Sequence, residues 1–289
     1  MKLMTTDKKL RHDFFLQNLL DTLNQSILSL RAIKAKYPDV QQIDRKIDSY
    51  IDLGLIKREN KRYYLNSELV FASQNGLVEK IVEKELALIK SSMQSIDYLF
   101  FSQYFRKLQL DQPKFILLEK FPKLYRLDEL KNQTNQVVFY SLNQLTEENL
   151  NLFSYFIHQD EESLSKAEQH INQYLGDVNP EYALKYMTTF LLKFLKKEQV
   201  TQKRTDIFVR ALVDFKVIEQ VAQDTYALKL PYVQNDIFDL PILDQLQAIE
   251  LESTVNQNQL ERFITIGIVH QKVYDYFMSE LFAYWTIKA

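Results

Sequence analysis

The first 66 residues carry a periodic pattern of apolar and polar positions that predicts three helices and a β-hairpin. The first helix begins near Asp13, where apolar residues start to recur at helical spacing. The residues Ser26 to Leu28 predict a short extended link. The second helix covers Leu30 to Lys36 and stops before Pro38, because the residue that precedes a proline is driven out of helical geometry.

A third helix is expected from Val40 to Leu53, with Asp39 as its N-cap. Its apolar residues share one face, so its polar residues lie on the others. Gly54 follows at the place where a helix commonly ends in a left-handed residue. The segment from Leu55 to Leu65 then alternates around the polar tip Glu59 to Lys61, a pattern that predicts a hairpin.

Polar and cationic side chains of the third helix and the hairpin form the candidate site. On the helix they are Gln41, Gln42, Arg45 and Lys46, and on the hairpin they are Lys57, Arg58, Lys61 and Arg62. Residues 30–66 hold nine cations and five anions, a net charge of +4 in a chain of net charge −2. Local contact with phosphates requires such a basic patch on an acidic body, although exposed Lys and Arg also occur on faces that contact only solvent.

The stretch IDSYIDLGLIKRENKRYYL resembles the winged helix-turn-helix superfamily in its succession of helix, glycine, Leu-Ile, charged hairpin and Tyr-x-Leu. The resemblance covers about residues 13–66. It implies a recognition helix at Val40 to Leu53 and a wing at Leu55 to Leu65. The same part of the chain is also similar to a bacterial protein family without an assigned function. Since the winged-helix scaffold serves regulators, replication factors and protein-binding subunits, the resemblance indicates fold more than function.

The rest of the chain is rich in helical patterns and has only 4 Gly and 6 Pro, so the expected fold class is mostly α. We expect an N-terminal winged helix of three helices and a small β-hairpin, followed by a helical body. The predicted segments are a winged-helix domain at 1–74, a helical middle region at 75–178, a degenerate second winged-helix unit at 179–232 and a C-terminal helical region at 233–289.

Two β-like runs interrupt the middle region. They are FILLEKF, between Pro113 and Pro122, and VVFYSL, from Val137 to Leu142. The two runs either pair with each other or are apolar linkers between helices. Helical patterns resume at Thr146 and again from Asp160 to Gly176.

An internal repeat is the reason to expect a second winged-helix unit. The residues Val213 to Ile218 align with Ile51 to Ile56, and Tyr226 then falls opposite Tyr64 without a gap. Asn179 and Pro180 supply a helix start upstream. The four hairpin cations correspond in the second unit to Glu219, Gln220, Gln223 and Asp224. We therefore do not expect the second unit to hold DNA; coincidence is the alternative explanation of the match.

The last segment, from Asn256 to Ile287, predicts a long helix with heptad-like spacing. The spaced residues are Leu260, Phe263, Gly267, His270, Tyr274, Phe277, Leu281 and Tyr284. Neighbouring apolar residues widen this surface beyond a narrow coiled-coil seam. We therefore expect burial in a domain core or in a homodimer interface rather than a free zipper.

Motifs of enzymatic chemistry are absent from the sequence. There is no cysteine and no glycine-rich phosphate loop, and the acidic clusters Glu147-Glu148 and Asp160 to Glu162 precede helical segments, where carboxylates favour the helix dipole. The four histidines are far apart in the sequence; they are His12, His158, His170 and His270. We expect a non-enzymatic protein without a cofactor or a metal site.

Aromatic residues and hydropathy limit the kinds of ligand and the cellular location to be expected. Most of the 17 Tyr and 19 Phe fall on apolar stripes and are assigned to the core. Tyr63, which alternates with an inward-facing Tyr64, is the exception that would stack on a base. No uncharged apolar run approaches the roughly 18 residues of a membrane span, and the N-terminus has charges where a secretory signal needs an apolar core. These features predict a cytoplasmic protein without a membrane contact.

The patterns together favour a DNA-binding protein, either a transcriptional regulator or a factor associated with replication or mobile elements. In double-stranded DNA, Gln41 and Gln42 would contact adenine and Arg45 guanine. Lys46 and the wing cations would hold phosphates. The alternative is a protein-interaction subunit that docks through its winged-helix modules and does not bind DNA. The acidic body, the second unit, which lacks the cations of the first hairpin, and the long apolar C-terminal segment favour that alternative.

Overall fold

The computed structural model of the chain divides into two compact units, each built from separate segments of the sequence. It describes residues 1–5, 7–11, 13–71, 75–108, 113–118, 122–131, 137–145, 152, 155–156, 166–204, 206–234 and 240–287. Unit 1 comprises Met1–Ser91, Leu110–Leu124 and Gln245–Val273, and unit 2 comprises Ser92–Gln109, Tyr125–Asp244 and Tyr274–Ala289. This division does not test the four contiguous segments expected from the sequence, which stay a prediction.

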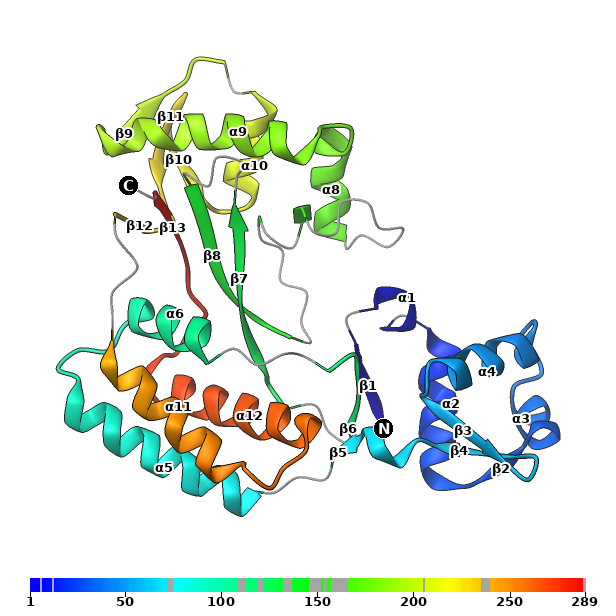
Figure 1. The fold of residues 1–289 in the computed structure, drawn as a ribbon. Helices are drawn as coiled ribbons and strands as arrows, with labels where there is room; N and C mark the ends of the chain where they lie inside the picture. The colour runs from blue at the N-terminus through cyan, green and yellow to red at the C-terminus, as the bar shows by residue number, and fades with distance from the viewer. Residues whose placement is uncertain are drawn as a thin grey trace. The chain divides into compact units, whose positions relative to one another are not determined.

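Residues 13–66 of unit 1 form three helices and a three-stranded antiparallel sheet, which we call the N-terminal module (Figure 1). The helices are α2 (Phe14–Gln25), α3 (Leu30–Lys36) and α4 (Ile43–Asp52), and the strands are β2 (Leu28–Ser29), β3 (Ile56–Glu59) and β4 (Arg62–Leu65). The strand order is β2-β4-β3, and a short helix, α1 (Lys8–Arg11), precedes the module. The sequence predicts these three helices and the hairpin, and the expected extended link contributes the strand β2.

Local side-chain chemistry sets the helix ends in this module. Asp13 caps α2, since its Oδ1 accepts a hydrogen bond from the N–H of Leu16 at 3.0 Å. Its Oδ2 accepts the hydroxyl of Tyr50 on α4 at 2.5 Å. Burial, and then this hydrogen bond, raise the pKa of Tyr50 above its ordinary value. Gly54 ends α4 with a φ of 75°, which glycine adopts without steric cost.

Helix α4 begins three residues later than the sequence predicts. Its N-cap is Gln42, which has a left-handed φ of 51° and makes no side-chain capping bond, so the prediction of an Asp39 cap is wrong. Left-handed backbone costs a residue other than glycine about 1 kcal/mol. Gln41 and Gln42 therefore lie on the turn that leads into α4, and not on the outer face of the helix.

A second sheet of unit 1 joins segments that are far apart in the sequence. Its strands are β1 (Lys2–Thr5), β6 (Phe115–Leu118) and β5 (Val70–Phe71), and a 3-10 helix, η1 (Ser67–Leu69), precedes β5. The central strand β6 pairs antiparallel with β1 and parallel with β5. The FILLEKF run thus forms a strand but does not pair with VVFYSL, which corrects both expected alternatives. Leu3, Phe115 and Leu117 join the buried cluster of the N-terminal module.

Two of the other helices of unit 1 share a buried ionisable pair. The other helices are α5 (Asn75–Ser92), α11 (Pro241–Ser253) and α12 (Gln259–Phe277); the C-terminal end of each of α5 and α12 and the N-terminal end of α11 belong to unit 2. On α12, the Nε2 of His270 lies 2.5 Å from the Oε1 of Glu250 on α11, and both side chains are buried. A hydrogen-bonded partner is what allows such groups to be buried.

The predicted C-terminal helix is wrong beyond Phe277, where α12 ends. The chain continues as the strand β13 (Ala283–Ile287), so Tyr284 lies on a strand and not on a helical heptad. Ile264 and Val269 of α12 are completely buried within the chain. At these positions the expected burial in a core is observed. A homodimer through this helix stays a prediction.

Unit 2 contains a four-stranded sheet of order β12-β13-β8-β7. Its strands are β12 (Tyr232–Val233), β13, β8 (Val137–Gln144) and β7 (Tyr125–Lys131). The VVFYSL run therefore lies inside a sheet, in β8. Helix α6 (Tyr98–Lys107) belongs to the same unit; its Ser102 hydroxyl lies 2.5 Å from the hydroxyl of Tyr284, whose ring stacks on Tyr140 with centroids 4.9 Å apart. Sheet and helix thus share an aromatic core.

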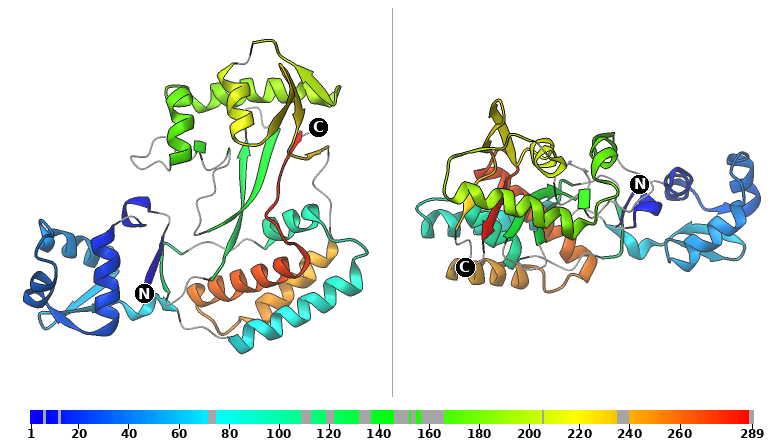
Figure 2. Two further views of the ribbon diagram at one scale, coloured as in Figure 1. Left: turned by 180° about the vertical axis from the view of Figure 1, so that it is seen from behind. Right: turned by 90° about the horizontal axis from the view of Figure 1, so that it is seen from above.

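Residues 179–230 of unit 2, coloured yellow-green to yellow in Figure 2, follow the order helix, strand, helix and hairpin that the N-terminal module also contains, and we call them the repeat module. Its elements are α9 (Pro180–Leu191), η2 (Leu192–Leu195), β9 (Gln199–Thr201), α10 (Ile207–Asp214), β10 (Ile218–Ala222) and β11 (Thr225–Leu228), preceded by α8 (Lys166–Leu175). The strand order β10-β11-β9 matches β3-β4-β2. The segment between β9 and α10 contains no counterpart of α3 among its described residues. Asn179 caps α9 as expected, since its Oδ1 accepts the N–H groups of Glu181 and Tyr182.

Equivalent backbone hydrogen bonds end the helices α4 and α10. The N–H of Leu55 donates to Tyr50, and the N–H of Val217 donates to Leu212, each at 2.9 Å. The hairpins differ by one residue, because β10 is irregular between Gln220 and Ala222. Tyr226 therefore pairs with the third hairpin residue, as Tyr63 does, which corrects the expected match to Tyr64.

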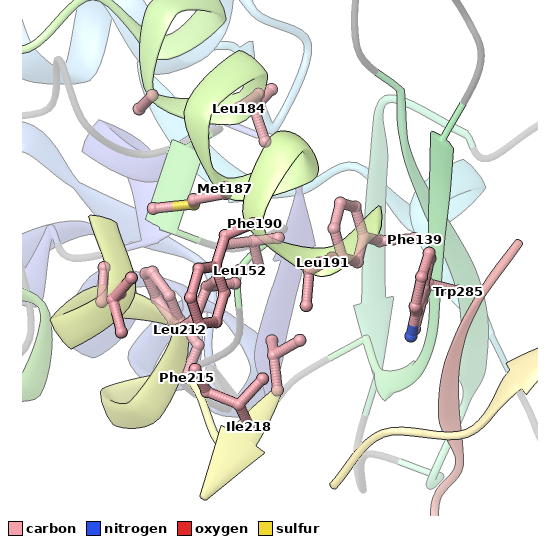
Figure 3. Packing of buried hydrophobic residues seen from close by; sticks show 14 of the residues in the cluster. Phe139, Leu152, Leu184, Met187, Phe190, Leu191, Leu212, Phe215, Ile218 and Trp285 are labelled. Carbon is pink, nitrogen blue, oxygen red and sulfur yellow. The ribbon is translucent and has the colours of Figure 1, made fainter. Parts of the chain in front are cut away.

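The repeat module packs onto the four-stranded sheet through one apolar cluster, part of which is drawn in Figure 3. Figure 3 shows Met187, Phe190 and Leu191 of α9 between side chains of α10 and the sheet residues Phe139 and Trp285. A fully buried aromatic or aliphatic side chain stabilises a fold by roughly 1.5–3 kcal/mol. This cluster therefore holds the repeat module within unit 2.

The fold is mixed α/β and not mostly α, because the described residues include four small sheets as well as the helices. Short strands with apolar runs of only two to five residues carry little periodic signal, and β1, β5 and β12 are of this kind. The helical patterns expected at Thr146 and Asp160 begin outside the described residues, and α8 forms the last part of the second. None of the described helices is long and apolar enough to cross a lipid bilayer.

Candidate nucleic-acid interface

Helix α4 and the turn before it carry four of the eight predicted site residues, and all four are exposed: Gln41, Gln42, Arg45 and Lys46. Arg45 lies on the first turn of α4 and forms no salt bridge within the described part of the chain. The ammonium group of Lys46 lies 5.7 Å from the ring centroid of Phe15. The N-terminal end of α4 thus presents two cations beside two amide side chains.

The β3–β4 hairpin carries the other four. Its turn is formed by Asn60 and Lys61, whose φ angles of 48° and 59° are those of a type I′ turn. Lys61 and Arg62 are exposed and form no salt bridge with any described residue. Arg58 is also exposed and places its guanidinium 5.4 Å from the centroid of Tyr63.

Lys57 differs from the other hairpin cations because a carboxylate neutralises it. Its Nζ lies 2.6 Å from the Oε1 of Glu68 on η1. Lys57 would have to break this salt bridge to hold a phosphate, and the lost pair would offset part of the free energy of phosphate binding. Lys57 is therefore the weakest of the predicted phosphate ligands.

The two tyrosines of the β3–β4 hairpin lie opposite to expectation. Tyr63 is buried, with 2% of its surface exposed, while Tyr64 is half-buried. The pKa of Tyr64 is raised, chiefly because its hydroxyl hydrogen-bonds Glu59. Tyr63 is therefore a core residue, and the prediction that it stacks on a base is wrong. In a strand this short, the alternation of residues does not reveal which of two neighbouring side chains faces the core.

Helix α3 connects the hairpin to the start of α4. Arg62 of the hairpin pairs with Ser29 in the sheet, and the hydroxyl of Ser29 accepts the N–H of Ala32 at 3.3 Å as the cap of α3. At the other side, Lys34 of α3 forms a 2.7 Å salt bridge with Asp44 of α4. The two cationic elements are thus parts of one packed module. Their convergence on a single ligand stays a prediction.

Three exposed carboxylates lie along α4 at intervals of four residues: Asp44, Asp48 and Asp52. Asp44 is compensated by Lys34, whereas Asp48 and Asp52 form no salt bridge with described residues. A phosphate near this side of α4 would be repelled. The positive surface of α4 is therefore confined to its N-terminal end, which sequence-based charge counting did not resolve.

The hairpin of the repeat module has no equivalent cations. Glu219, Gln220 and Gln223 are exposed, and Asp224 is half-buried with a left-handed φ of 54°. The positions keep the backbone geometry of a hairpin but not the charge of the wing. This difference agrees with the expectation that the second hairpin does not hold DNA, which stays a prediction.

Groups with catalytic or metal-binding chemistry are few in the described residues. His270 is buried against Glu250, and His170 is exposed, with its Nε2 3.4 Å from the Nη2 of Arg210. No group of three or more metal-ligating side chains occurs in the part of the chain that the structure describes. His12, His158 and the acidic clusters at 147–148 and 160–162 lie outside the described residues. A non-enzymatic role stays a prediction.

Comparison with known proteins gives one match. Residues 2–96 match a domain family described as "Domain of unknown function (DUF1803)". This match covers the N-terminal module and the whole of α5. No curated protein and no solved structure matches the chain.

Proposed function

We propose that the chain is a non-enzymatic DNA-binding protein, a transcriptional regulator or a replication- or mobile-element-associated factor, whose N-terminal module is a winged helix. In this proposal α4 is the recognition helix and the β3–β4 hairpin is the wing. The order of three helices and a hairpin, with β4 between β2 and β3, supports the assignment. Winged helices are helix-turn-helix variants, and the helix-turn-helix inserts its second helix into the major groove.

The N-terminal end of α4 is the part that would contact bases. In helix-turn-helix complexes the N-terminal residues of the recognition helix reach the base edges. Gln41 and Gln42 carry the amide groups that pair with adenine, and Arg45 carries the fork that pairs with guanine. Lys46, at the edge of the same turn, would hold a phosphate.

The wing would hold the backbone of the duplex through Arg58, Lys61 and Arg62. The conformation and exposure of Lys61 are the observation that carries the proposal. It occupies a left-handed position of the turn, where glycine or asparagine would be less strained, and its side chain is exposed and unpaired among the described residues. Strained backbone is characteristic of functional positions, because an optimally stable turn would use a different residue. A phosphate contact gives a lysine at this position a function.

A gel-shift assay at low salt with duplex DNA tests the proposal. We expect the full chain to bind, and its affinity to fall by orders of magnitude as salt rises, because phosphate contacts release counterions. The double variant Arg45→Glu/Arg62→Glu should abolish binding. Lys80→Glu/Lys84→Glu on α5 is the matched control, since it changes the net charge equally outside the N-terminal module. Equal binding by wild type and the first variant would reject this surface.

A protein-docking subunit without DNA binding is the second candidate function. Phe14 and Ile27 of the N-terminal module expose 84% and 61% of their surface, and α4 exposes two uncompensated carboxylates. These features suit a protein partner better than a phosphate backbone. No affinity for DNA even at low salt would favour this candidate.

A cytoplasmic location, without a membrane contact, belongs to the same proposal, and so does a homodimer through α12. The exposed apolar residue on α12 is Tyr276, with 56% of its surface exposed. Two copies would present two recognition helices to a symmetric site, as dimeric helix-turn-helix proteins do. Sedimentation of the purified chain tests the dimer directly, and a monomer at micromolar concentration would contradict it.

A further inference from the structure

The repeat module exposes an aromatic cluster on the face shared by α9 and α10. Tyr182 and Tyr186, one turn apart on α9, expose 50% and 43% of their surface. The ring of Phe208, on the first turn of α10, stacks on Tyr186 with centroids 5.2 Å apart and an angle of 18° between the planes. Tyr182 lies 4.5 Å from Tyr186 and 5.9 Å from Phe208. The sequence pattern assigned most aromatic rings of the chain to the core, and these two tyrosines are exceptions to that assignment.

Polar contacts fix the cluster in place. The pKa of Tyr182 is raised, chiefly by a hydrogen bond between its hydroxyl and that of Tyr186. Asp206 caps α10, since its Oδ1 accepts the N–H groups of Phe208 and Val209 at 3.0 and 2.8 Å. The three rings are therefore held in a defined arrangement before any ligand binds.

A chain of hydrogen bonds leads from this cluster to a group of cations. The Oδ2 of Asp206 accepts the side-chain amide of Gln202 at 3.1 Å, and the Oε1 of Gln202 accepts the ammonium of Lys193 at 3.2 Å. Gln202 is followed directly by Lys203 and Arg204. The residues 193–206 contain five cations and two anions; the cations are Lys193, Lys196, Lys197, Lys203 and Arg204.

The cations of this group are exposed, and four of the five are unengaged among the described residues. These four, Lys196, Lys197, Lys203 and Arg204, have no side-chain hydrogen bond or salt bridge with the residues that the structure describes. Of the two anions, Asp206 already caps α10 and accepts a hydrogen bond from Gln202. Glu198 is therefore the carboxylate of this segment that can still reduce the positive charge. The cationic character that the second hairpin lost is therefore present on a different side of the same module.

We propose that this aromatic and cationic face binds single-stranded nucleic acid, with bases stacked on Tyr182 and Tyr186 and the phosphates held by Lys193, Lys203 and Arg204. Ring platforms beside a positive strip are the features by which single strands are held without sequence preference. Duplex DNA keeps its bases stacked internally and would use only the cations. A protein ligand would use the rings but has no need of five cations. The rings and the cations together therefore favour a single strand.

The site is independent of the wing, so the test uses the full chain with Arg45→Glu/Arg62→Glu as the background. The probe is a fluorescein-labelled oligothymidylate of about 20 nucleotides, which exceeds the footprint of one such site and forms no duplex. Fluorescence anisotropy at low salt should show binding. Tyr182→Ala/Tyr186→Ala should weaken it by about tenfold or more, because each lost stack removes a base contact. In the same background, Lys203→Glu/Arg204→Glu should weaken oligonucleotide binding more than the tyrosine variant does, and it should reduce the salt dependence of binding.

Matched controls separate this site from general charge and hydrophobicity. Leu251→Ala removes an exposed apolar side chain of α11, and Lys80→Glu/Lys84→Glu makes the same charge change on α5. Both controls should bind the oligonucleotide as the background does. The proposal is overturned if the background chain does not bind, if the tyrosine variant binds equally well, or if a duplex of the same length competes as effectively as the single strand. Loss of affinity in the α5 control equal to that in Lys203→Glu/Arg204→Glu would also overturn it.

Discussion

Lys216 of the repeat module has the left-handed backbone that Gly54 has at the same point of the N-terminal module, with φ angles of 58° and 75°. Both residues follow a helix and donate their N–H to a carbonyl three residues before, Val213 and Ile51. Only glycine occupies such a position without steric cost. The two modules thus share a helix ending, but one of them carries strain there.

The first prediction follows from this strain. Lys216→Gly should raise the free energy of unfolding by about 1 kcal/mol, and Gly54→Ala should lower it by a similar amount. A Cβ at Gly54 would meet no atom within 4 Å, so the expected loss comes from the backbone alone. Urea denaturation followed by circular dichroism measures both. Lys229→Gly, directly after β11 at a residue without a positive φ, is the control and should destabilise. Destabilisation by Lys216→Gly would contradict the argument.

The sequence predicts those elements whose ends are set by local side-chain chemistry. Helices with caps and periodic apolar faces, such as α2, α3 and α9, are found close to their predicted bounds because local chemistry sets them. The start of α4 was misplaced because Gln42 adopts a left-handed conformation that no propensity signals. The strand β13 was read as helix, since its pairing with β8 depends on residues far away in the sequence.

The candidate site was predictable in composition and less so in geometry. Cations at Arg45, Lys61 and Arg62 are exposed, as the pattern indicated. The salt bridge of Lys57 with Glu68 was not expected, because η1 is too short to leave a periodic signal. The face of Tyr182 and Tyr186 was missed for another reason: apolar rings on a helix indicate burial unless the packing of neighbouring helices is known.

A second prediction concerns Lys61, which combines a strained backbone with an exposed charge. Lys61→Gly should raise the free energy of unfolding by about 1 kcal/mol, because glycine relieves the left-handed turn. The same change should weaken duplex binding and reduce its salt dependence by about one counterion. Thermal denaturation and a salt titration of DNA affinity measure the two effects. A stabilised variant that binds DNA as tightly as wild type would show that Lys61 does not contact the duplex.

Lys57 supplies the matched control for that measurement. It is on the same hairpin, but its ammonium is paired with Glu68 at 2.6 Å. Lys57→Gln should therefore change DNA affinity less than Lys61→Gln does. An equal loss for both variants would mean that only the net charge of the wing matters.

A third prediction concerns the carboxylate of Asp48 on the exposed side of α4. If the N-terminal end of α4 enters the major groove, Asp48 lies one turn further along the helix and repels nearby phosphates. Asp48→Asn should strengthen duplex binding severalfold at low salt, and the gain should shrink at high salt because exposed charges are screened. Asp177→Asn, in the turn after α8 of unit 2, is a charge-matched control that should have no effect. Weaker binding by Asp48→Asn would indicate that this carboxylate contacts a base or a protein partner instead.

The last prediction concerns alkaline stability and Tyr155 of unit 2. Burial raises the pKa of Tyr155 to about 12, and the carboxylate of Glu168 adds to the shift. The hydroxyl donates to the Oδ1 of Asn172 at 3.1 Å and can keep that bond only while it is protonated. The folded chain therefore holds this proton more tightly than the unfolded chain, in which the pKa of tyrosine is about 10.

The sign of the effect follows from this difference. The contribution of Tyr155 is complete below about pH 10 and is lost as the pH rises towards about 12, with a total of about 2–3 kcal/mol. Tyr174 and Tyr274 have pKa values raised in the same direction by burial, so the whole chain should lose stability in this range. Urea midpoints measured between about pH 9 and 12 should fall less steeply for Tyr155→Phe than for wild type. Tyr276→Phe, which removes an exposed hydroxyl, should keep the wild-type slope, and an identical slope for Tyr155→Phe would show that this hydroxyl does not couple to folding.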